Sequence, residues 1–178
     1  MEHSSPARRD TPPQPRALID CGDLDISIDR DGSWFYRGTP IKRAALVKLF
    51  SSVLHRAADG TYWLITPAER GRVAVADAPF IGVELFRAGD GAAQTLSLRT
   101  NLDEIVAIGP EHLLRVETSA SGEPRPYVMI RNGLEARLAR PVFYELVELG
   151  IEERVGDTTL YGVWSMGRFF PLGSLTAI

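Results

Sequence analysis

The sequence predicts an α+β protein made of two similar small units, each consisting of a strand hairpin, a helix and further strands. The chain of 178 residues is 44% hydrophobic and 24% charged, a composition typical of globular proteins. Its apolar residues recur with the period of strands in most segments and with the period of a helix in two segments. The strand–turn–helix pattern occurs twice along the chain, which favours an internal duplication.

The first 17 residues contain four prolines, three arginines and almost no large apolar side chains. Such a segment cannot offset the entropy lost on ordering, so we expect a disordered tail over residues 1–17. A basic docking arm is the alternative interpretation of this composition. The two units are then expected to span residues 18–92 and 93–178.

The first unit begins with apolar and polar residues that alternate over 24–28, as in a half-buried strand. Asp31-Gly32 predicts a hairpin turn, and the aromatic residues 34–36 predict the second strand. Thr39-Pro40 suits the start of a helix, whose apolar face continues toward a stop near residue 60. Short strand-like runs follow at 62–65, 73–75 and 83–86.

The second unit repeats this order with more strands before the hairpin. Asn132-Gly133 predicts the hairpin turn, and apolar residues alternate again over 134–138. Pro141 suits the first turn of a helix that Gly150 would end. The other predicted strands lie at 96–99, 104–108, 113–117, 127–130, 160–164 and 169–170.

Two pairs of arginines support the duplication. Arg37 and Arg131 are 94 positions apart (131 − 37), and Arg43 and Arg137 are separated by the same step (137 − 43). The alternative is that patterning alone makes any two such units look alike. Because each unit is too small to bury both faces of its sheet, we expect the two units to pack together and to form a ligand site at their junction.

Charge and cysteine content exclude several classes of protein. The net charge of −3 disfavours a general nucleic-acid or anionic-membrane binder. No apolar run approaches the roughly 18 to 20 residues of a membrane span, and the chain starts without a hydrophobic signal segment. The single cysteine, Cys21, fits a reducing compartment. We therefore expect a cytoplasmic protein with neither nucleic acid nor membrane as its partner.

Catalytic and cofactor motifs are missing from the sequence. It contains no phosphate-binding loop and no glycine-rich dinucleotide fingerprint. His3, His55 and His112 are scattered, which predicts no metal site and no cofactor. Ser165 lacks the nucleophile-elbow sequence, and nothing in the spacing pairs Cys21 with a base. The sequence therefore leans against an enzyme.

Arginine and aromatic residues provide the candidate binding groups. Arginine accounts for 18 of the 20 basic residues, since Lys42 and Lys48 are the only lysines. The planar guanidinium suits phosphate or carboxylate, and an aromatic ring gives a stacking surface. The alternatives are that the arginines form ion pairs across the junction and that the aromatic residues belong to the core.

Several loops carry motifs that resemble a bacterial family known as domain of unknown function 1285. The motifs are Asp31-Gly32-x-Trp34-Phe35-Tyr36-x-Gly38-x-Pro40, Thr66-Pro67-x-Glu69, Asp77-Ala78-Pro79-Phe80, Thr100-Asn101, Arg131-x-Gly133-Leu134-Glu135-Ala136 and Trp164-Ser165-x-Gly167. The resemblance implies two related α+β units, the second superficially similar to a pleckstrin-homology-like fold. It also implies a role in signal transduction and a cleft that takes a nucleotide-like ligand.

The resemblance assigns ten residues to that cleft: Trp34, Tyr36, Arg43, Thr66, Glu69, Asp77, Thr100, Asn101, Arg131 and Arg137. Our leading hypothesis is a non-enzymatic protein that binds a small anionic, nucleotide-type ligand between its units. One alternative is an adaptor that docks a signalling protein through a strand edge. A less favoured alternative is a hydrolase that uses Asp77 and Glu69.

Overall fold

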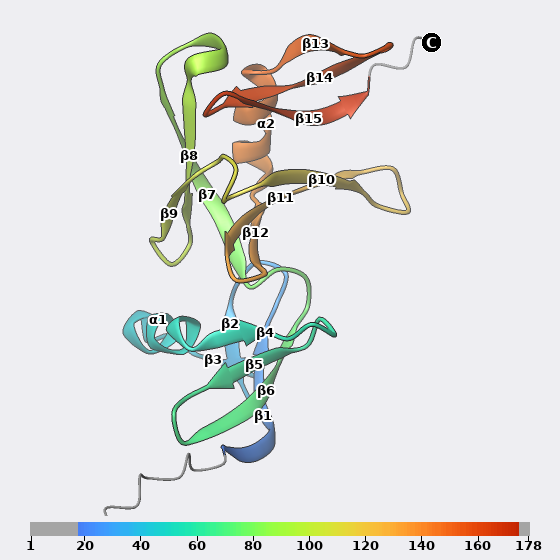
Figure 1. Ribbon diagram of the computed structural model, residues 1–178. Helices are drawn as coiled ribbons and strands as arrows, with labels where there is room; N and C mark the ends of the chain where they lie inside the picture. Colours follow the sequence, from blue (N-terminus) through green and yellow to red (C-terminus); the bar gives the residue numbers. More distant parts are fainter. Residues whose placement is uncertain (1–17, 175–178) are drawn as a thin grey trace, which may run out of the picture.

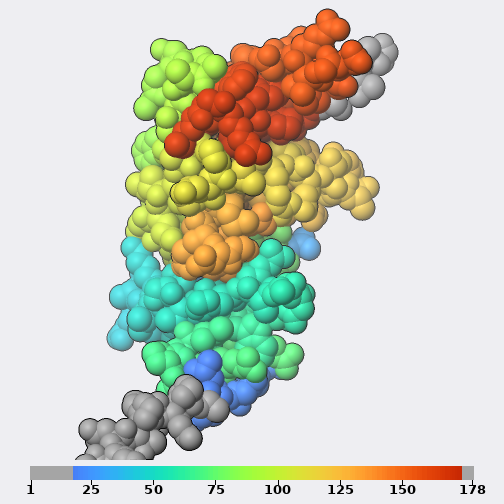
Figure 2. Space-filling view, in the orientation of Figure 1, coloured from blue at the N-terminus to red at the C-terminus, as the bar shows by residue number. Residues whose placement is uncertain are grey.

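A computed structural model describes residues 18–174 as strands in three sheets with two short α-helices (Figure 1). This arrangement confirms the α+β class. The two units are stacked along the long axis of the molecule (Figure 2). The predicted tail, residues 1–17, lies outside the described residues. No helix within 18–174 has the length and apolar character needed to span a membrane.

The first unit is a six-stranded sheet with the helix α1 (Ala44–Ser52). The strand order is β3-β2-β1-β6-β5-β4, and β1 pairs with β6 in parallel. Apolar residues of β1 and β6 and Val47 of α1 are buried in the core. The strands are β1 (Ile19–Ile28), β2 (Trp34–Tyr36), β3 (Thr39–Pro40), β4 (Leu54–Arg56), β5 (Tyr62–Ile65) and β6 (Glu69–Val75).

The predicted helix in this unit was too long at both ends. Arg37 and Gly38 have φ angles of 49° and 75°, which form a tight turn. That turn pairs Thr39–Pro40 with β2 as the short strand β3, so α1 starts only at Ala44. The helix ends at Ser52 because Leu54, 2% exposed, enters the sheet opposite Leu64.

The second unit contains two sheets joined by the helix α2 (Arg140–Glu148), which contacts both β7 and β14 (Figure 1). The first sheet has the order β10-β11-β12-β7-β8-β9, and the second the order β13-β14-β15. Its elements are β7 (Phe80–Ala88), the 3₁₀ turn η1 (Gly91–Ala93), β8 (Thr95–Thr100), β9 (Ile105–Ala107), β10 (Leu114–Thr118), β11 (Pro124–Arg131), β12 (Leu134–Leu138), β13 (Ile151–Val155), β14 (Thr158–Ser165) and β15 (Arg168–Ser174).

The chain passes from the first unit to the second between β6 and β7, which is earlier than residue 92. The reason is that β7 pairs with β8 and, in parallel, with β12, so it belongs to the second unit. β13 is a strand that the sequence patterns did not predict. Its residues, Ile-Glu-Glu-Arg-Val, are mostly exposed and show no regular alternation of burial.

The two units share a hairpin with a tight turn followed by a nine-residue helix. Asn132 and Gly133, with φ angles of 45° and 79°, repeat the turn of Arg37 and Gly38. The equivalent glycines are 95 positions apart (133 − 38) and the helix starts 96 (140 − 44). The 94-residue step of the arginines therefore does not connect equivalent positions, because Arg37 lies in its turn whereas Arg131 ends a strand. The pleckstrin-homology-like likeness stays a prediction.

One hydrophobic cluster runs through both units. Trp34 and Leu54 of the first unit belong to the same buried cluster as Phe80 and Leu134 of the second. The indole Nε1 of Trp34 is buried without a hydrogen-bond partner among residues 18–174. Because the cluster is continuous, the centre of the junction is apolar, and the charged side chains that connect the units lie at its margins.

Gly162 provides a test of the packing between β14 and β15. A Cβ atom there would collide with the backbone oxygen of Phe170 and lie 2.9 Å from the Cα of Pro171. We expect Gly162→Ala to lower the free energy of unfolding by about 1–3 kcal/mol, measured by urea denaturation. Gly173→Ala is the matched control, since its Cβ would meet nothing within 4 Å. Equal effects of the two substitutions would contradict this packing.

Candidate functional site

Arg131 at the end of β11 joins the two units. Its Nε donates to Oε1 of Glu104 at 3.0 Å, and its Nη2 donates to the backbone oxygen of Ser51 at 2.8 Å. Ser51 lies in the last turn of α1, and its carbonyl oxygen also accepts from a backbone amide at the helix end. The guanidinium also lies over the ring of Phe80, 5.4 Å from its centroid. One side chain thus fixes α1 of the first unit to the second unit.

Arg137 of β12 makes a second connection. Its Nη1 lies 3.3 Å from Oδ2 of Asp77, and its Nη2 donates to the backbone oxygen of Arg30 at 2.8 Å. Asp77, in the segment between β6 and β7, accepts a further hydrogen bond from the Tyr127 hydroxyl at 2.8 Å. Both acceptors of Arg137 precede residue 80, so this guanidinium also bridges the units.

Asn101 and Lys48 contribute further contacts across the junction. The Asn101 side chain accepts from the Ile81 amide at 3.0 Å and donates to the Gly32 carbonyl at 3.5 Å. A Cβ on Gly32 would lie 2.7 Å from Nδ2 of Asn101, so the turn needs glycine for this close approach. The ammonium of Lys48 pairs with Asp103 at 2.5 Å.

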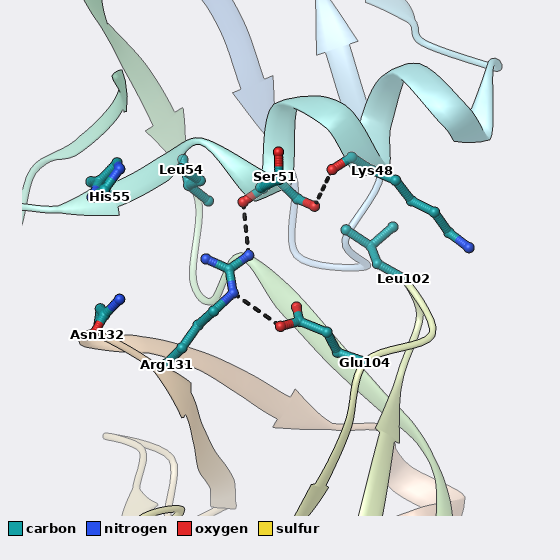
Figure 3. Close-up of a pocket in the computed structure, with 9 residues that line it drawn as sticks. Lys48, Ser51, Leu54, His55, Leu102, Glu104, Arg131 and Asn132 are labelled. Carbon is teal, nitrogen blue, oxygen red and sulfur yellow. Dashed lines mark hydrogen bonds and ion pairs between the residues drawn. The ribbon is translucent and has the colours of Figure 1, made fainter. Parts of the chain in front are cut away.

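A hollow of about 410 Å³ opens at the junction beside Arg131, and we call it the seam hollow (Figure 3). Nη1 of Arg131, which neither Glu104 nor Ser51 uses, points toward the side where His55 and Asn132 lie. Lys48 and Arg131 contribute two positive charges to its lining, and Glu104 contributes one negative charge. The lining residues are Lys48, Ser51, Ser52, Leu54, His55, Leu102, Glu104, Arg131 and Asn132.

Four of the ten expected site residues lie at the junction: Asp77, Asn101, Arg131 and Arg137. Of these, only Arg131 lines the seam hollow. Thr100 is completely buried beside the junction, and its Oγ1 accepts from the amides of Leu102 and Glu104. Its hydroxyl therefore shapes the loop that presents Glu104.

The other expected site residues lie elsewhere. Oγ1 of Thr66 accepts from the amide of Glu69 at 3.1 Å, which stabilises the turn between β5 and β6. Trp34 is 2% exposed and stacks on Phe50 in the core. Tyr36 is exposed next to the guanidinium of Arg37, and Arg43 is exposed just before α1. Among residues 18–174, no Phe, Tyr or Trp side chain lines the seam hollow; its apolar lining consists of Leu54 and Leu102.

Sequence reasoning did not select Lys48, His55, Glu104 and Asn132 as site residues, although all four line the seam hollow. Asn132 had a usable signal, because a hairpin turn that follows Arg131 must present its exposed side chain next to that arginine. Glu104 gave no signal, since its partner is distant in sequence and only the fold brings the two together.

Neither candidate nucleophile, Ser165 or Cys21, lies in an environment that would activate it. Ser165 is completely buried, accepts from the Leu96 amide and donates to the Ile108 carbonyl. Partial desolvation and the neighbouring Glu69 raise the pKa of the Cys21 thiol, which disfavours the reactive thiolate. Among residues 18–174, no three His, Cys, Asp or Glu side chains form a group that could hold a metal ion.

Tyr127 provides a pH test of the contact with Asp77. Burial, followed by the hydrogen bond to Asp77, raises the pKa of this phenol from 10 to about 12. The unfolded chain therefore loses this proton at a lower pH than the folded chain. The contribution of Tyr127 to the free energy of unfolding is complete below pH 10 and is lost as pH rises toward 12. Urea denaturation between pH 9.5 and 12 should show this loss of stability in the wild type. It should be smaller in Tyr127→Phe and unchanged in the control Tyr36→Phe; an equal loss in all three would contradict the contact.

Comparison with known proteins identifies relatives over both units. Residues 14–78 match the model of the domain of unknown function (DUF1285), N-terminal domain, and residues 79–172 match the protein of unknown function (DUF1285), C-terminal domain. The boundary between these matches coincides with the change of sheet between β6 and β7. A search of curated proteins gives no match.

Two solved structures are similar to this chain. A DUF1285 family protein from Silicibacter pomeroyi DSS-3 is 40% identical with a TM-score of 0.82, covering 94% of this chain and 91% of the other. A DUF1285 family protein from Shewanella baltica OS155 is 31% identical with a TM-score of 0.56, covering 71% of this chain and 91% of the other. Since the two family domains together span nearly all described residues, the chain belongs to the DUF1285 family.

Proposed function

We propose that this chain is a non-enzymatic binding module of the bacterial cytoplasm that takes a small anionic, nucleotide-type ligand in the seam hollow and acts in signal transduction. The observation that carries the proposal is the state of Arg131. Two of its nitrogens are held by Glu104 and Ser51, while Nη1 faces the hollow. The guanidinium is therefore already ordered before an anion arrives, which lowers the entropic cost of binding.

The rest of the lining suits a ligand with one anionic group and one apolar part. Because Lys48 is paired with Asp103, Arg131 is the cationic group offered to a single phosphate or carboxylate, and Asn132 and His55 lie on the side toward which Nη1 points. Leu54 and Leu102 provide apolar surface for a ring. In this proposal a ring packs against aliphatic side chains rather than stacking on the aromatic residues expected from sequence.

A signalling role follows from the position of Arg131 between the units. A ligand that binds Nη1 contacts a group that already connects α1 with β11 and Glu104. If the ligand prefers one relative arrangement of the two units, its binding shifts the population toward that arrangement. The chain would then report the ligand concentration to a protein that recognises one arrangement.

A thermal-shift panel of mono-, di- and cyclic nucleotides tests the proposal. A ligand at 100 times its dissociation constant adds about 2.7 kcal/mol of stability, which raises the melting temperature by roughly 5–10 °C for a protein of this size. We expect Asn132→Asp to keep the tight turn but to repel the anion and remove most of the shift. Ala92→Asp adds the same charge in η1, away from the junction, and should leave the shift intact.

Two outcomes would contradict a ligand site in the seam hollow. One is the absence of a shift with every nucleotide of the panel. The other is a shift that Asn132→Asp and Ala92→Asp reduce equally, because this would indicate a general effect of charge rather than contact with the hollow.

A second candidate function is that of an adaptor for a signalling protein, which the edge of β13 favours. β13 lies at the margin of its three-stranded sheet, and among residues 18–174 no strand pairs with its outer side. Ile151 and Val155 at its two ends are 47% and 51% exposed. A partner could add a strand there. This candidate becomes the better one if no nucleotide shifts the melting temperature and a partner co-purifies with the chain.

A further inference from the structure

A second hollow, of about 580 Å³, shares no lining residue with the seam hollow. Four arginines line it, and we call it the arginine hollow: Arg30, Arg125, Arg137 and Arg140. Arg30 belongs to the turn between β1 and β2 of the first unit, whereas the other three belong to the second unit. Phe143 and Tyr144 of α2 also line it, and the Tyr144 side chain is 57% exposed.

The local fold explains why the arginines converge. Along β12 the apolar residues Leu134, Ala136 and Leu138 are buried, so Arg137 points away from that core. Two residues after β12 the chain enters α2 at Arg140, with no side-chain cap from Ala139. The positive end of the α2 dipole therefore lies on the same margin of the hollow as these guanidiniums.

The positive charge in the arginine hollow is largely uncompensated. Glu123 is the only carboxylate that lines it; with Asp77, which pairs with Arg137, four guanidiniums and two carboxylates leave two net positive charges (4 − 2) on a chain whose net charge is −3. The side chains of Arg30, Arg125 and Arg140 make no hydrogen bond or ion pair within residues 18–174, and Glu117, opposite Arg125 in the sheet, is paired with Arg115.

Four like charges around one hollow repel one another, and an anion between them would relieve that repulsion. Guanidinium groups bind phosphate oxygens with two parallel hydrogen bonds, so the three unpaired arginines suit more than one phosphate group. The hollow is concave and the chain as a whole is acidic, which favours a compact anion over a long nucleic acid. The exposed ring of Tyr144 lines the same hollow, so an organic group attached to the phosphates could pack against it.

We propose that the arginine hollow is a binding site for a compact, multiply charged phosphate compound of the diphosphate class. Arg125 and Arg140 hold the phosphates from the second unit, and Arg30 holds them from the first. Arg137 forms part of the wall of the site, since its guanidinium lines the hollow and donates to the backbone oxygen of Arg30. This site is separate from the seam hollow, which has a smaller net charge and, among residues 18–174, no Phe, Tyr or Trp in its lining.

Isothermal titration of the full chain with inorganic pyrophosphate at low salt tests the site. We expect one molecule bound per chain, with an affinity that falls as salt is added. Arg125→Gln and Arg140→Gln should each weaken binding by about tenfold, because each removes a charge-assisted contact. Arg43→Gln is the matched control: this exposed arginine precedes α1 and lines neither hollow, so its loss should leave the affinity unchanged.

Three results would overturn the proposal: no binding of pyrophosphate, binding that Arg125→Gln and Arg140→Gln leave unchanged, or binding that Arg43→Gln weakens as much as they do. The seam-hollow variant Asn132→Asp should bind pyrophosphate like the wild type, so the two proposed sites can fail independently. Two further arms identify the carrier of the phosphates. Tighter binding of adenosine diphosphate than of pyrophosphate indicates a soluble nucleotide, and arginine-dependent binding to phosphatidylcholine vesicles only when they contain phosphatidylinositol bisphosphate indicates a lipid headgroup.

Discussion

The structure depends on the guanidinium of Arg131, which is held between a carboxylate of the second unit and a helix carbonyl of the first. The pair with Glu104 fixes its orientation, and Nη2 donates to the Ser51 carbonyl at the end of α1, an oxygen that also accepts from a backbone amide at the helix end. Arg137 is held in the same way, by an ion pair with Asp77 and a hydrogen bond to the backbone oxygen of Arg30. Because these links occupy the margins of a junction whose centre is apolar, they determine where hollows can form between the units.

Local patterns predicted the parts of the fold that local rules control. Asn132-Gly133 formed the expected tight turn, and α2 begins one residue before Pro141, where the proline suits the first turn. The patterns failed where tertiary packing determines the end of a helix or the boundary between the units. The helical spacing of apolar residues continues past Ser52, but Leu54 pairs with Leu64 as a strand residue of the sheet. The unit boundary was also missed, because the pairing of β7 with β12 joins residues 56 positions apart (136 − 80).

The candidate site was predictable to the same limited extent. Arg131 and Arg137 lie at the junction and form ion pairs there. The pair of Arg131 with Glu104 lies within the second unit, however, and Arg131 reaches the first unit through the Ser51 carbonyl. Thr66 and Glu69 lie at the β5–β6 turn, because a Thr-Pro motif of this kind stabilises a turn whether or not a ligand is near. The convergence of Arg30 with Arg125 and Arg140 could not be inferred from spacing, since it depends on how the units pack.

A double-mutant cycle between Arg131 and Glu104 tests the central claim most directly. Urea unfolding of Arg131→Met, Glu104→Gln and the double variant should give a coupling free energy of about 1–3 kcal/mol, because the pair is partly buried and orders the junction. The same cycle for Arg37 and Asp25, whose side chains are 70% and 61% exposed, should give about 0.5 kcal/mol or less. Equal coupling in the two pairs would contradict the account, because it would mean that Glu104 does not order the Arg131 guanidinium at the junction.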